Sequence, residues 1–349
     1  MHLLHVPLPA HCTMHDHTHA DHDHAHCDHA HCDHDHDHGP KHIYLYSPSG
    51  AIRDKKAFRR GVARLKALGH EVEVDPSALE SWTRFAGDDD TRLAAIERAC
   101  KSGADVAMIT RGGYGLSRLL HRIDYEQIAT AAKNGTRFVG LSDFTALQLA
   151  ALAKTKTVTW AGPALMDDFG CEDEPDDIML DCFEDLLSGH GEGAGWRVSA
   201  ERAGTVTGAS ALDDTYIPKA TLWGGNLAMV ASLVGTPYVP KIKGGVLFLE
   251  DVGEHPYRVE RMLTSLLHAG VLAQQKAVVL GQFSNYKLTP HDKGFKLQNV
   301  VQWLRTQIDA PVFTNLPFGH VPTKVVLPVG AQVSLSVEGR DALIYWGHV

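Results

Sequence analysis

Ser142 is the side chain of this sequence whose neighbours best suit a nucleophile. It lies in the run Gly140-Leu141-Ser142-Asp143, between an apolar segment typical of a strand and a segment typical of a helix. A sharp turn at such a junction lifts the hydroxyl out of a sheet and points the next amide, that of Asp143, at a developing oxyanion. Phe144 occupies the last glycine position of Gly-x-Ser-x-Gly, so this is not a plain α/β-hydrolase elbow. The alternative interpretation, a helix N-cap, stays open.

A glycine-rich run, Arg111-Gly112-Gly113-Tyr114-Gly115, follows another predicted strand. Glycines let the backbone approach a ligand closely and present its N–H groups, so Gly112 and Gly113 can supply a second oxyanion donor. The run matches neither the dinucleotide fingerprint nor the P-loop. A simple tight turn is the alternative interpretation.

A base and an orienting acid complete the chemistry. Glu250 and Asp251 end the apolar run Val246 to Leu249, and the carboxyl ends of strands are where α/β proteins gather active sites. His320 follows the predicted strand Val312 to Thr314 in a Pro/Gly-bounded loop. Together with Ser142 they form a nucleophile, an orienting acid and a base in the order Ser, Glu, His. Ordinary loop acids and a solvated histidine are the alternatives.

The elements that must position these residues alternate along the first half of the body. Short apolar runs and amphipathic segments follow one another from Ile43 to about Trp160, which predicts a parallel sheet with helices on both faces. We expect a Rossmann-like N-terminal domain over residues 43–165 and a linker over 166–203. A mixed, β-rich α/β domain is expected over 204–349, with β-like sequence at 204–212 and a hairpin around Glu338-Gly339.

Composition narrows the class of protein. The chain has 349 residues, 44% hydrophobic and 21% charged, and a formal net charge of -9. Lys and Arg are scattered, which argues against a general nucleic-acid binder. No apolar run reaches the roughly 18 residues of a membrane span, and the first residues do not fit a secretory signal. We expect a cytoplasmic protein without structural disulfides.

The first 42 residues form a separate, low-complexity segment. They hold 15 of the 23 histidines, and Asp-His-Ala-His-Cys occurs twice in succession, at 23–27 and 28–32. The segment has too few apolar residues to offset its ordering entropy, so we expect a disordered tail. Imidazole, thiolate and carboxylate groups bind Zn²⁺, Ni²⁺ or Cu²⁺. The candidate ligands are His22, His24, His26, Cys27, His29, His31, Cys32 and His34.

Five ordered motifs resemble those of the LD-carboxypeptidases, and the match covers nearly everything from Ile43 to Val349. The motifs are the Arg111 to Gly115 run, Gly140 to Thr145, Trp223-Gly224-Gly225-Asn226-Leu227, Leu247 to Glu254, and Gly319-His320. The resemblance implies that Ser142, Glu250 and His320 form a metal-independent triad, with oxyanion donors at Asp143 and in the Gly112-Gly113 turn. It also implies removal of the terminal D-alanine from cytoplasmic murein tetrapeptide during cell-wall recycling, and a homodimer.

Several further residues are expected to contact the substrate, and two other functions stay open. A carboxypeptidase must hold a free carboxylate, for which Arg111 and Arg118 are candidates, with surface ion pairs as the alternative. The other expected substrate contacts are Tyr114, Trp223 and Asn226, and Glu254 is a rival orienting group. An immunity-type hydrolase of peptidyl-nucleotide conjugates and a metal-handling protein are the alternative functions.

Overall fold

The computed structural model describes residues 39–199 and 214–349. Those residues belong to one compact unit, Asp37–Val349. The expected tail with its metal ligands and the β-like segment at 204–212 lie outside the described residues.

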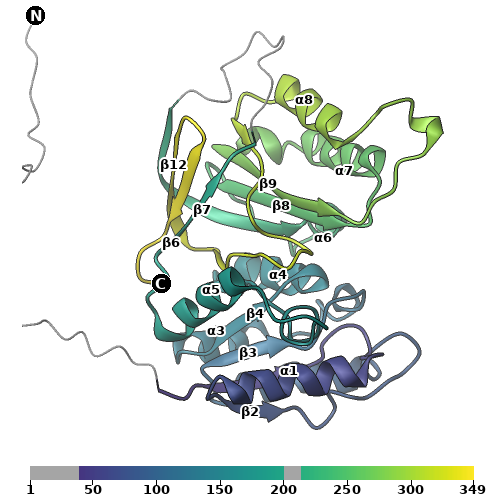
Figure 1. The fold of residues 1–349 in the computed structure, drawn as a ribbon, viewed down its shortest axis with the longest axis vertical. Helices are drawn as coiled ribbons and strands as arrows, with labels where there is room; N and C mark the ends of the chain where they lie inside the picture. The colour runs from purple at the N-terminus through teal and green to yellow at the C-terminus, as the bar shows by residue number, and fades with distance from the viewer. Residues whose placement is uncertain (1–38, 200–213) are drawn as a thin grey trace, which may run out of the picture. The chain divides into compact units, whose positions relative to one another are not determined.

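The first sheet is six-stranded, in the order β11-β5-β4-β3-β1-β2, and parallel except for β11 (Figure 1). Successive side chains of a strand point to opposite faces, so Ile43 and Leu45 pack on one face while Tyr44 and Tyr46 pack on the other. Both faces are buried, as the continuous apolar runs predict. The strands are β1 (His42–Tyr46), β2 (Glu71–Val74), β3 (Val106–Ile109), β4 (Arg137–Gly140), β5 (Thr159–Ala161) and β11 (Leu327–Val329).

Helices cover both faces of this sheet. Two of them, α1 (Lys55–Ala67) and α5 (Asp177–Ser188), pack on the face of Ile43 and Leu45. Three pack on the opposite face: α2 (Asp89–Lys101), α3 (Tyr125–Lys133) and α4 (Thr145–Thr155). The helix α1 ends before Gly69, whose φ of +97° is a left-handed conformation that favours glycine. The expected α/β architecture with helices on both faces is therefore confirmed.

The second sheet is seven-stranded and mixed, in the order β10-β9-β8-β7-β12-β13-β6. Its β10-β9-β8-β7 part is parallel and its β7-β12-β13-β6 part is antiparallel, which confirms the predicted antiparallel content. The strands are β6 (Gly193–Arg197), β7 (Thr215–Asn226), β8 (Val246–Val252), β9 (Ala277–Ser284), β10 (Val312–Phe313), β12 (Gln332–Glu338) and β13 (Asp341–Tyr345).

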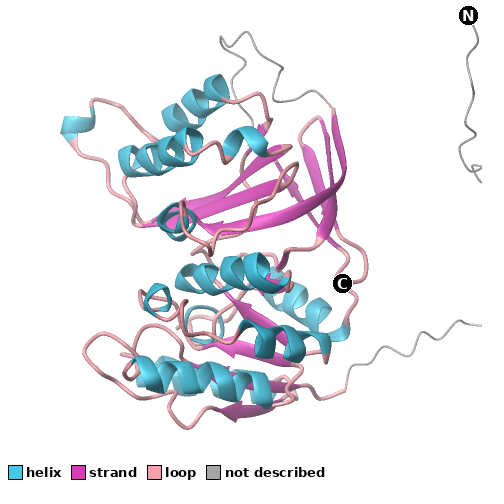
Figure 2. Cartoon of the chain, turned by 180° about the vertical axis from the view of Figure 1, so that it is seen from behind, coloured by secondary structure: helices cyan, strands magenta, loops and turns pink. Residues whose placement is uncertain are grey.

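Three helices pack beside β8 and β9 in the second half (Figure 2). They are α6 (Leu227–Leu233), α7 (Pro256–His268) and α8 (Leu297–Gln307). The sequence interpretation did not include α8, nor the strand β6 inside the expected linker. In the part of the chain that the structure describes, no helix is long and apolar enough to cross a bilayer.

Two differences from the expected elements bear on the site. The strand β8 does not end at Leu249 but continues to Val252, and its pairing with β9 shifts register between Leu249 and Asp251. Such an irregularity re-aims a side chain, and Glu250 lies within it. The short strand β11 belongs to the C-terminal half of the sequence but pairs antiparallel with β5 of the first sheet. Both halves of the sequence therefore contribute strands to that sheet.

Candidate active site

Ser142 occupies a strained turn between β4 and α4. It begins the 3₁₀ turn η2 (Ser142–Phe144), and its φ is +65°, a left-handed conformation that non-glycine residues seldom adopt. The residue before α4 is Phe144, and no side chain caps that helix. Ser142 is therefore not a helix cap, and its backbone has the conformation of a nucleophile turn.

The glycine turn lies directly against this serine. A Cβ on Gly112 would come within 2.6 Å of Ser142 Cβ and 2.8 Å of Ser142 Oγ, so only glycine fits there. The same Cβ would lie 3.6 Å from the backbone nitrogen of Asp143. The two backbone segments expected to supply oxyanion donors thus lie side by side at the hydroxyl, with Gly113 at a φ of +90°.

The carboxylate of Asp143 ties the glycine turn to the nucleophile turn. Its Oδ2 accepts hydrogen bonds of 2.8 Å from Ser49 Oγ and from the backbone N–H of Leu116. Burial raises the pKa of Asp143 above its ordinary value, although these bonds and the charge of Arg92 oppose the shift. Ser49 did not stand out in the sequence, because a Ser-Pro-Ser-Gly turn carries no signal of a distant partner.

Glu250 and His320 form a hydrogen-bonded pair. Glu250 Oε2 lies 2.8 Å from His320 Nδ1, the carboxylate is fully buried, and the imidazole is 18% exposed. A carboxylate carries no proton, so Nδ1 donates and Nε2 keeps a lone pair for a nucleophile. Gly319 lets the loop approach, since a Cβ there would lie 3.1 Å from Glu250 Oε2.

The neighbouring Glu250 shifts the pKa of His320. Burial by itself lowers that pKa, but the hydrogen bond and charge of Glu250, with the charge of Asp167, outweigh burial. The pKa of His320 therefore lies above its ordinary value of 6.5.

Asn226 and Asp251 hold the other side of Glu250. The Asn226 side-chain amide donates to Glu250 Oε1 at 3.2 Å and to Asp251 Oδ1 at 3.0 Å. Burial and the charge of Glu250 raise the pKa of Asp251 to about 6, although the hydrogen bond from the backbone N–H of Val252 opposes the shift. Asn226 is only 5% exposed, so its contacts in this structure are with the acids rather than with an open substrate site.

Several contacts join the half that carries Ser142 to the half that carries His320. The backbone N–H of Asn226 donates to Thr145 Oγ1 at 3.1 Å. Beyond the histidine, Lys324 Nζ lies 2.6 Å from Asp168 Oδ1, and each side chain is 1% exposed. Among the described residues, no hydrogen bond joins Ser142 Oγ to His320. The structure thus pairs Glu250 with His320, and the hydrogen bond between Ser142 and His320 that the triad requires remains a prediction.

The expected substrate residues differ in what they contact. Arg118 binds Asp89 at 2.9 Å, which favours the structural alternative, whereas Arg111 donates a hydrogen bond of 3.1 Å to the backbone oxygen of Ala51. Tyr114 is 44% exposed. Trp223 is 1% exposed and donates from Nε1 to Gln275 at 2.9 Å, so this side chain packs in the core and is not placed to contact a substrate.

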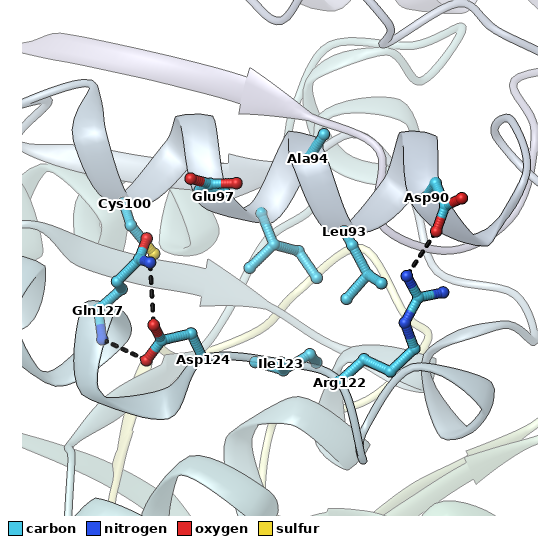
Figure 3. A pocket seen from close by; sticks show the side chains of 10 residues that line it. Asp90, Leu93, Ala94, Glu97, Cys100, Arg122, Ile123, Asp124 and Gln127 are labelled. Atoms are coloured by element: carbon cyan, nitrogen blue, oxygen red, sulfur yellow. Dashed lines mark hydrogen bonds and ion pairs between the residues drawn. The ribbon is translucent and has the colours of Figure 1, made fainter.

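A cavity of about 210 Å³ lies away from these residues, between α2 and α3 (Figure 3). Its polar groups bond one another: Arg122 pairs with Asp90, and Gln127 with Asp124. Burial, with the nearby charges of Asp124 and Glu97, raises the pKa of the Cys100 thiol to about 12, so it is not a nucleophile at neutral pH. This cavity lacks the chemistry of the Ser142 site.

Within residues 39–199 and 214–349, no group of three or more His, Cys, Asp or Glu side chains is arranged to hold a metal ion. The tail ligands from His22 to His34 lie outside those ranges.

Comparison with known proteins agrees with the motifs. Residues 43–162 match the LD-carboxypeptidase N-terminal domain, and residues 219–335 match the LD-carboxypeptidase C-terminal domain. The chain is 27% identical over 298 residues to a probable murein peptide carboxypeptidase of Bacillus subtilis, covering 84% of this chain and 88% of the relative.

Solved structures show the same fold. The muramoyltetrapeptide carboxypeptidase from Oxalobacter formigenes superposes with a TM-score of 0.77 at 37% identity, covering 88% of this chain and 98% of that one. The microcin C7 self immunity protein MccF, in complex with aspartyl sulfamoyl adenosine, has a TM-score of 0.76 at 22% identity, with 89% and 97% covered. The chain, with both family domains in order, belongs to the LD-carboxypeptidase family of peptidases.

Proposed function

We propose that this protein is a serine carboxypeptidase that removes the terminal D-alanine from cytoplasmic murein tetrapeptide, using Ser142, His320 and Glu250. The observation that carries the proposal is the hydrogen bond between buried Glu250 and His320 Nδ1, which leaves Nε2 as a base. The Bacillus and Oxalobacter relatives, named for murein peptide and muramoyltetrapeptide, support the substrate class.

The chemistry follows from the roles of the three groups. His320 Nε2 takes the proton of Ser142, whose Oγ attacks the carbonyl of the L-configured centre of diaminopimelate. The amides of Asp143 and of the Gly112-Gly113 turn stabilise the oxyanion. His320 returns the proton to the leaving nitrogen, D-alanine departs, and water activated by the same base hydrolyses the acyl-enzyme. Glu250 orients the imidazole and stabilises its positive charge.

Release of D-alanine from murein tetrapeptide tests the proposal. We expect turnover by the natural chain, loss of turnover in Ser142→Ala, and unchanged turnover in Ser232→Ala, which removes an exposed hydroxyl from α6. Equal melting temperatures of the three proteins would show that the fold is intact. Release by Ser142→Ala at the natural rate would overturn the assignment of the nucleophile, and no release by the natural chain would overturn the substrate.

The same assay decides the alternative of a peptidyl-nucleotide hydrolase. The likeness to MccF, at 22% identity, concerns the fold alone. An aminoacyl sulfamoyl adenosine is therefore tested as a competing substrate. We expect a higher kcat/KM for murein tetrapeptide than for an aminoacyl sulfamoyl adenosine. The reverse order would move this protein to the immunity-type function.

We also propose that the N-terminal tail binds divalent transition metals independently of catalysis. The support is its sequence: two consecutive Asp-His-Ala-His-Cys repeats among alternating Asp and His residues. Titration of the full chain with Zn²⁺, Ni²⁺ and Cu²⁺ should show tight binding that is weakened when all eight candidate ligands, from His22 to His34, are replaced by Ala. Catalysis should survive both that replacement and chelation. Hydrolysis abolished by chelation and restored by one metal would instead indicate a metalloenzyme.

A further inference from the structure

A small hairpin carries exposed aromatic and cationic side chains next to the glycine turn. Trp82 and Phe85 exchange backbone hydrogen bonds of 2.9 and 3.0 Å, and the two residues between them, Thr83 and Arg84, form the turn. Trp82 is 47% exposed, and its ring stacks on that of Phe85 with centroids 6.1 Å apart. The outer surface of this hairpin therefore presents an indole and a guanidinium to solvent.

Two backbone hydrogen bonds and one close contact link this hairpin to the nucleophile. The Arg84 carbonyl accepts a hydrogen bond of 3.0 Å from Ala51, and the neighbouring Gly50 donates at 3.3 Å to the carbonyl of Gly112. Gly112 in turn lies against Ser142. Ala51, Gly50 and Gly112 thus form a continuous bridge from Arg84 to the reacting hydroxyl.

Arg84 and Arg111 differ from Arg92, Arg118 and Arg122 in their electrostatic partners. Arg92 and Arg118 both bind Asp89, and Arg122 binds Asp90. Arg84 has no carboxylate partner in the part of the chain that the structure describes. An unneutralised guanidinium on a hairpin that is hydrogen-bonded to the segment beside the glycine turn favours an anionic ligand.

The side chain of Arg84 also has an aromatic neighbour. Its guanidinium carbon lies 5.7 Å from the ring centroid of Tyr114, which is itself 6.0 Å from Phe85. A cation over an aromatic ring keeps its N–H groups free for a carboxylate. The ordering cost of binding is smaller for a side chain whose freedom a ring contact already reduces.

We infer that Arg84, with Trp82 and Tyr114, forms a subsite for a second carboxylate of the substrate, distinct from the terminal one. The inference rests on the proposed carboxypeptidase function. Arg111 reaches the glycine turn itself, since a Cβ on Gly113 would lie 3.4 Å from its Nη1, and it suits the terminal carboxylate near the scissile bond. Arg84 is exposed and lies on the neighbouring hairpin rather than in the glycine turn. A single leaving D-alanine has only one carboxylate, so the anion at Arg84 belongs to the acyl part of an acidic peptide.

A pair of substrates tests this subsite: murein tetrapeptide, and the same peptide with its non-terminal carboxylates amidated. We expect Arg84→Gln to raise KM for the acidic peptide roughly 10- to 100-fold, the range of a charge-assisted hydrogen bond, with kcat within about twofold. The amidated peptide should be cleaved alike by the natural chain and by Arg84→Gln. For the acidic peptide, the KM of Arg84→Lys should lie between those of the natural chain and of Arg84→Gln. Lysine keeps the positive charge but cannot form the two parallel hydrogen bonds of a guanidinium.

Arg59→Gln is the matched control, since it removes the same charge from an exposed position on α1. It should leave KM unchanged for both peptides. An equal effect of Arg84→Gln on the acidic and amidated peptides, or none on either, would overturn the subsite. So would an effect confined to an aminoacyl sulfamoyl adenosine. Failure of the natural chain to cleave tetrapeptide at all would instead refute the proposed function, so the two failures are distinguishable.

Discussion

The backbone N–H of Asn226 donates a hydrogen bond of 3.1 Å to Thr145 Oγ1, and this bond joins the half that carries Glu250 to the half that carries Ser142. Thr145 follows the nucleophile by three residues at the start of α4. Asn226 ends β7, and its side chain donates to Glu250. A single buried hydroxyl is therefore placed to set the separation of the nucleophile from the acid-base pair.

Replacing that hydroxyl should reduce both stability and turnover. Thr145→Val keeps the shape but leaves the buried Asn226 N–H unpaired, which should lower the free energy of unfolding by about 1–3 kcal/mol. Misplacement of the pair should lower kcat roughly 10- to 100-fold with a smaller change in KM. Thr145→Ser retains the acceptor and should keep most of both. Urea unfolding and steady-state kinetics measure the two effects, and equal behaviour of the Val and Ser variants would contradict this role.

Gly112→Ala tests the close approach of the glycine turn to the nucleophile. The new methyl would meet Ser142 Cβ at 2.6 Å, so the serine or the turn must move and the oxyanion donors lose their alignment. One misplaced donor is worth about 2.7–4 kcal/mol in the transition state, so kcat should fall at least 100-fold. Gly195→Ala is the control, because its Cβ would meet nothing nearer than 3.7 Å, and it should be fully active. Full activity of Gly112→Ala would show that the turn does not supply a donor.

The pH dependence of kcat/KM should report the pairing of His320 with Glu250. The imidazole must be neutral to accept a proton, and its pKa lies above 6.5, so the acidic limb should have its midpoint above pH 6.5. Glu250→Gln removes the charge that raises this pKa. Its limb should therefore move to lower pH while kcat falls, and an unmoved limb would assign the limb to another group.

The same shift has a consequence for folding stability. Because the folded pKa of His320 is raised, the stabilisation from protonated His320 is fully present below its unfolded pKa. It is lost as pH rises through the folded pKa. Glu250→Gln should flatten this part of the curve of unfolding free energy against pH.

The sequence predicted best what depends on neighbours along the chain. Ile43 to Tyr46 is a local apolar run and became β1, and Gly69 ended α1 because a left-handed residue there costs glycine little. The strand and the helix on either side of Ser142 were predictable for the same reason, whereas the four residues around Ser142 left a helix N-cap open as the alternative.

What the sequence did not predict depends on distant partners. Glu250 lies within β8 rather than after it, because pairing with β9 extends the strand. The pairing of β11 with β5 and the ion pair of Lys324 with Asp168 join segments more than 150 residues apart, for which a single sequence has no local signal. Trp223 was expected to contact substrate because it lies in one of the motifs that resemble the family, yet the glycines after it allow β7 to pack closely, and the indole is buried.

The ion pair of Lys324 and Asp168 should prove essential to the loop that carries His320. Both groups are 1% exposed, so Lys324→Met leaves a buried carboxylate without its counter-charge and should lower the free energy of unfolding by about 3–5 kcal/mol. The double variant Asp168→Asn/Lys324→Met removes both charges and should recover much of that loss. Urea unfolding of the two variants measures the difference, and a single variant as stable as the natural chain would contradict the buried pair.

The charge of Lys324 also lowers the pKa of His320, four residues away, so Lys324→Met should move the acidic limb of kcat/KM to higher pH. A purely structural role for the pair would leave that limb in place.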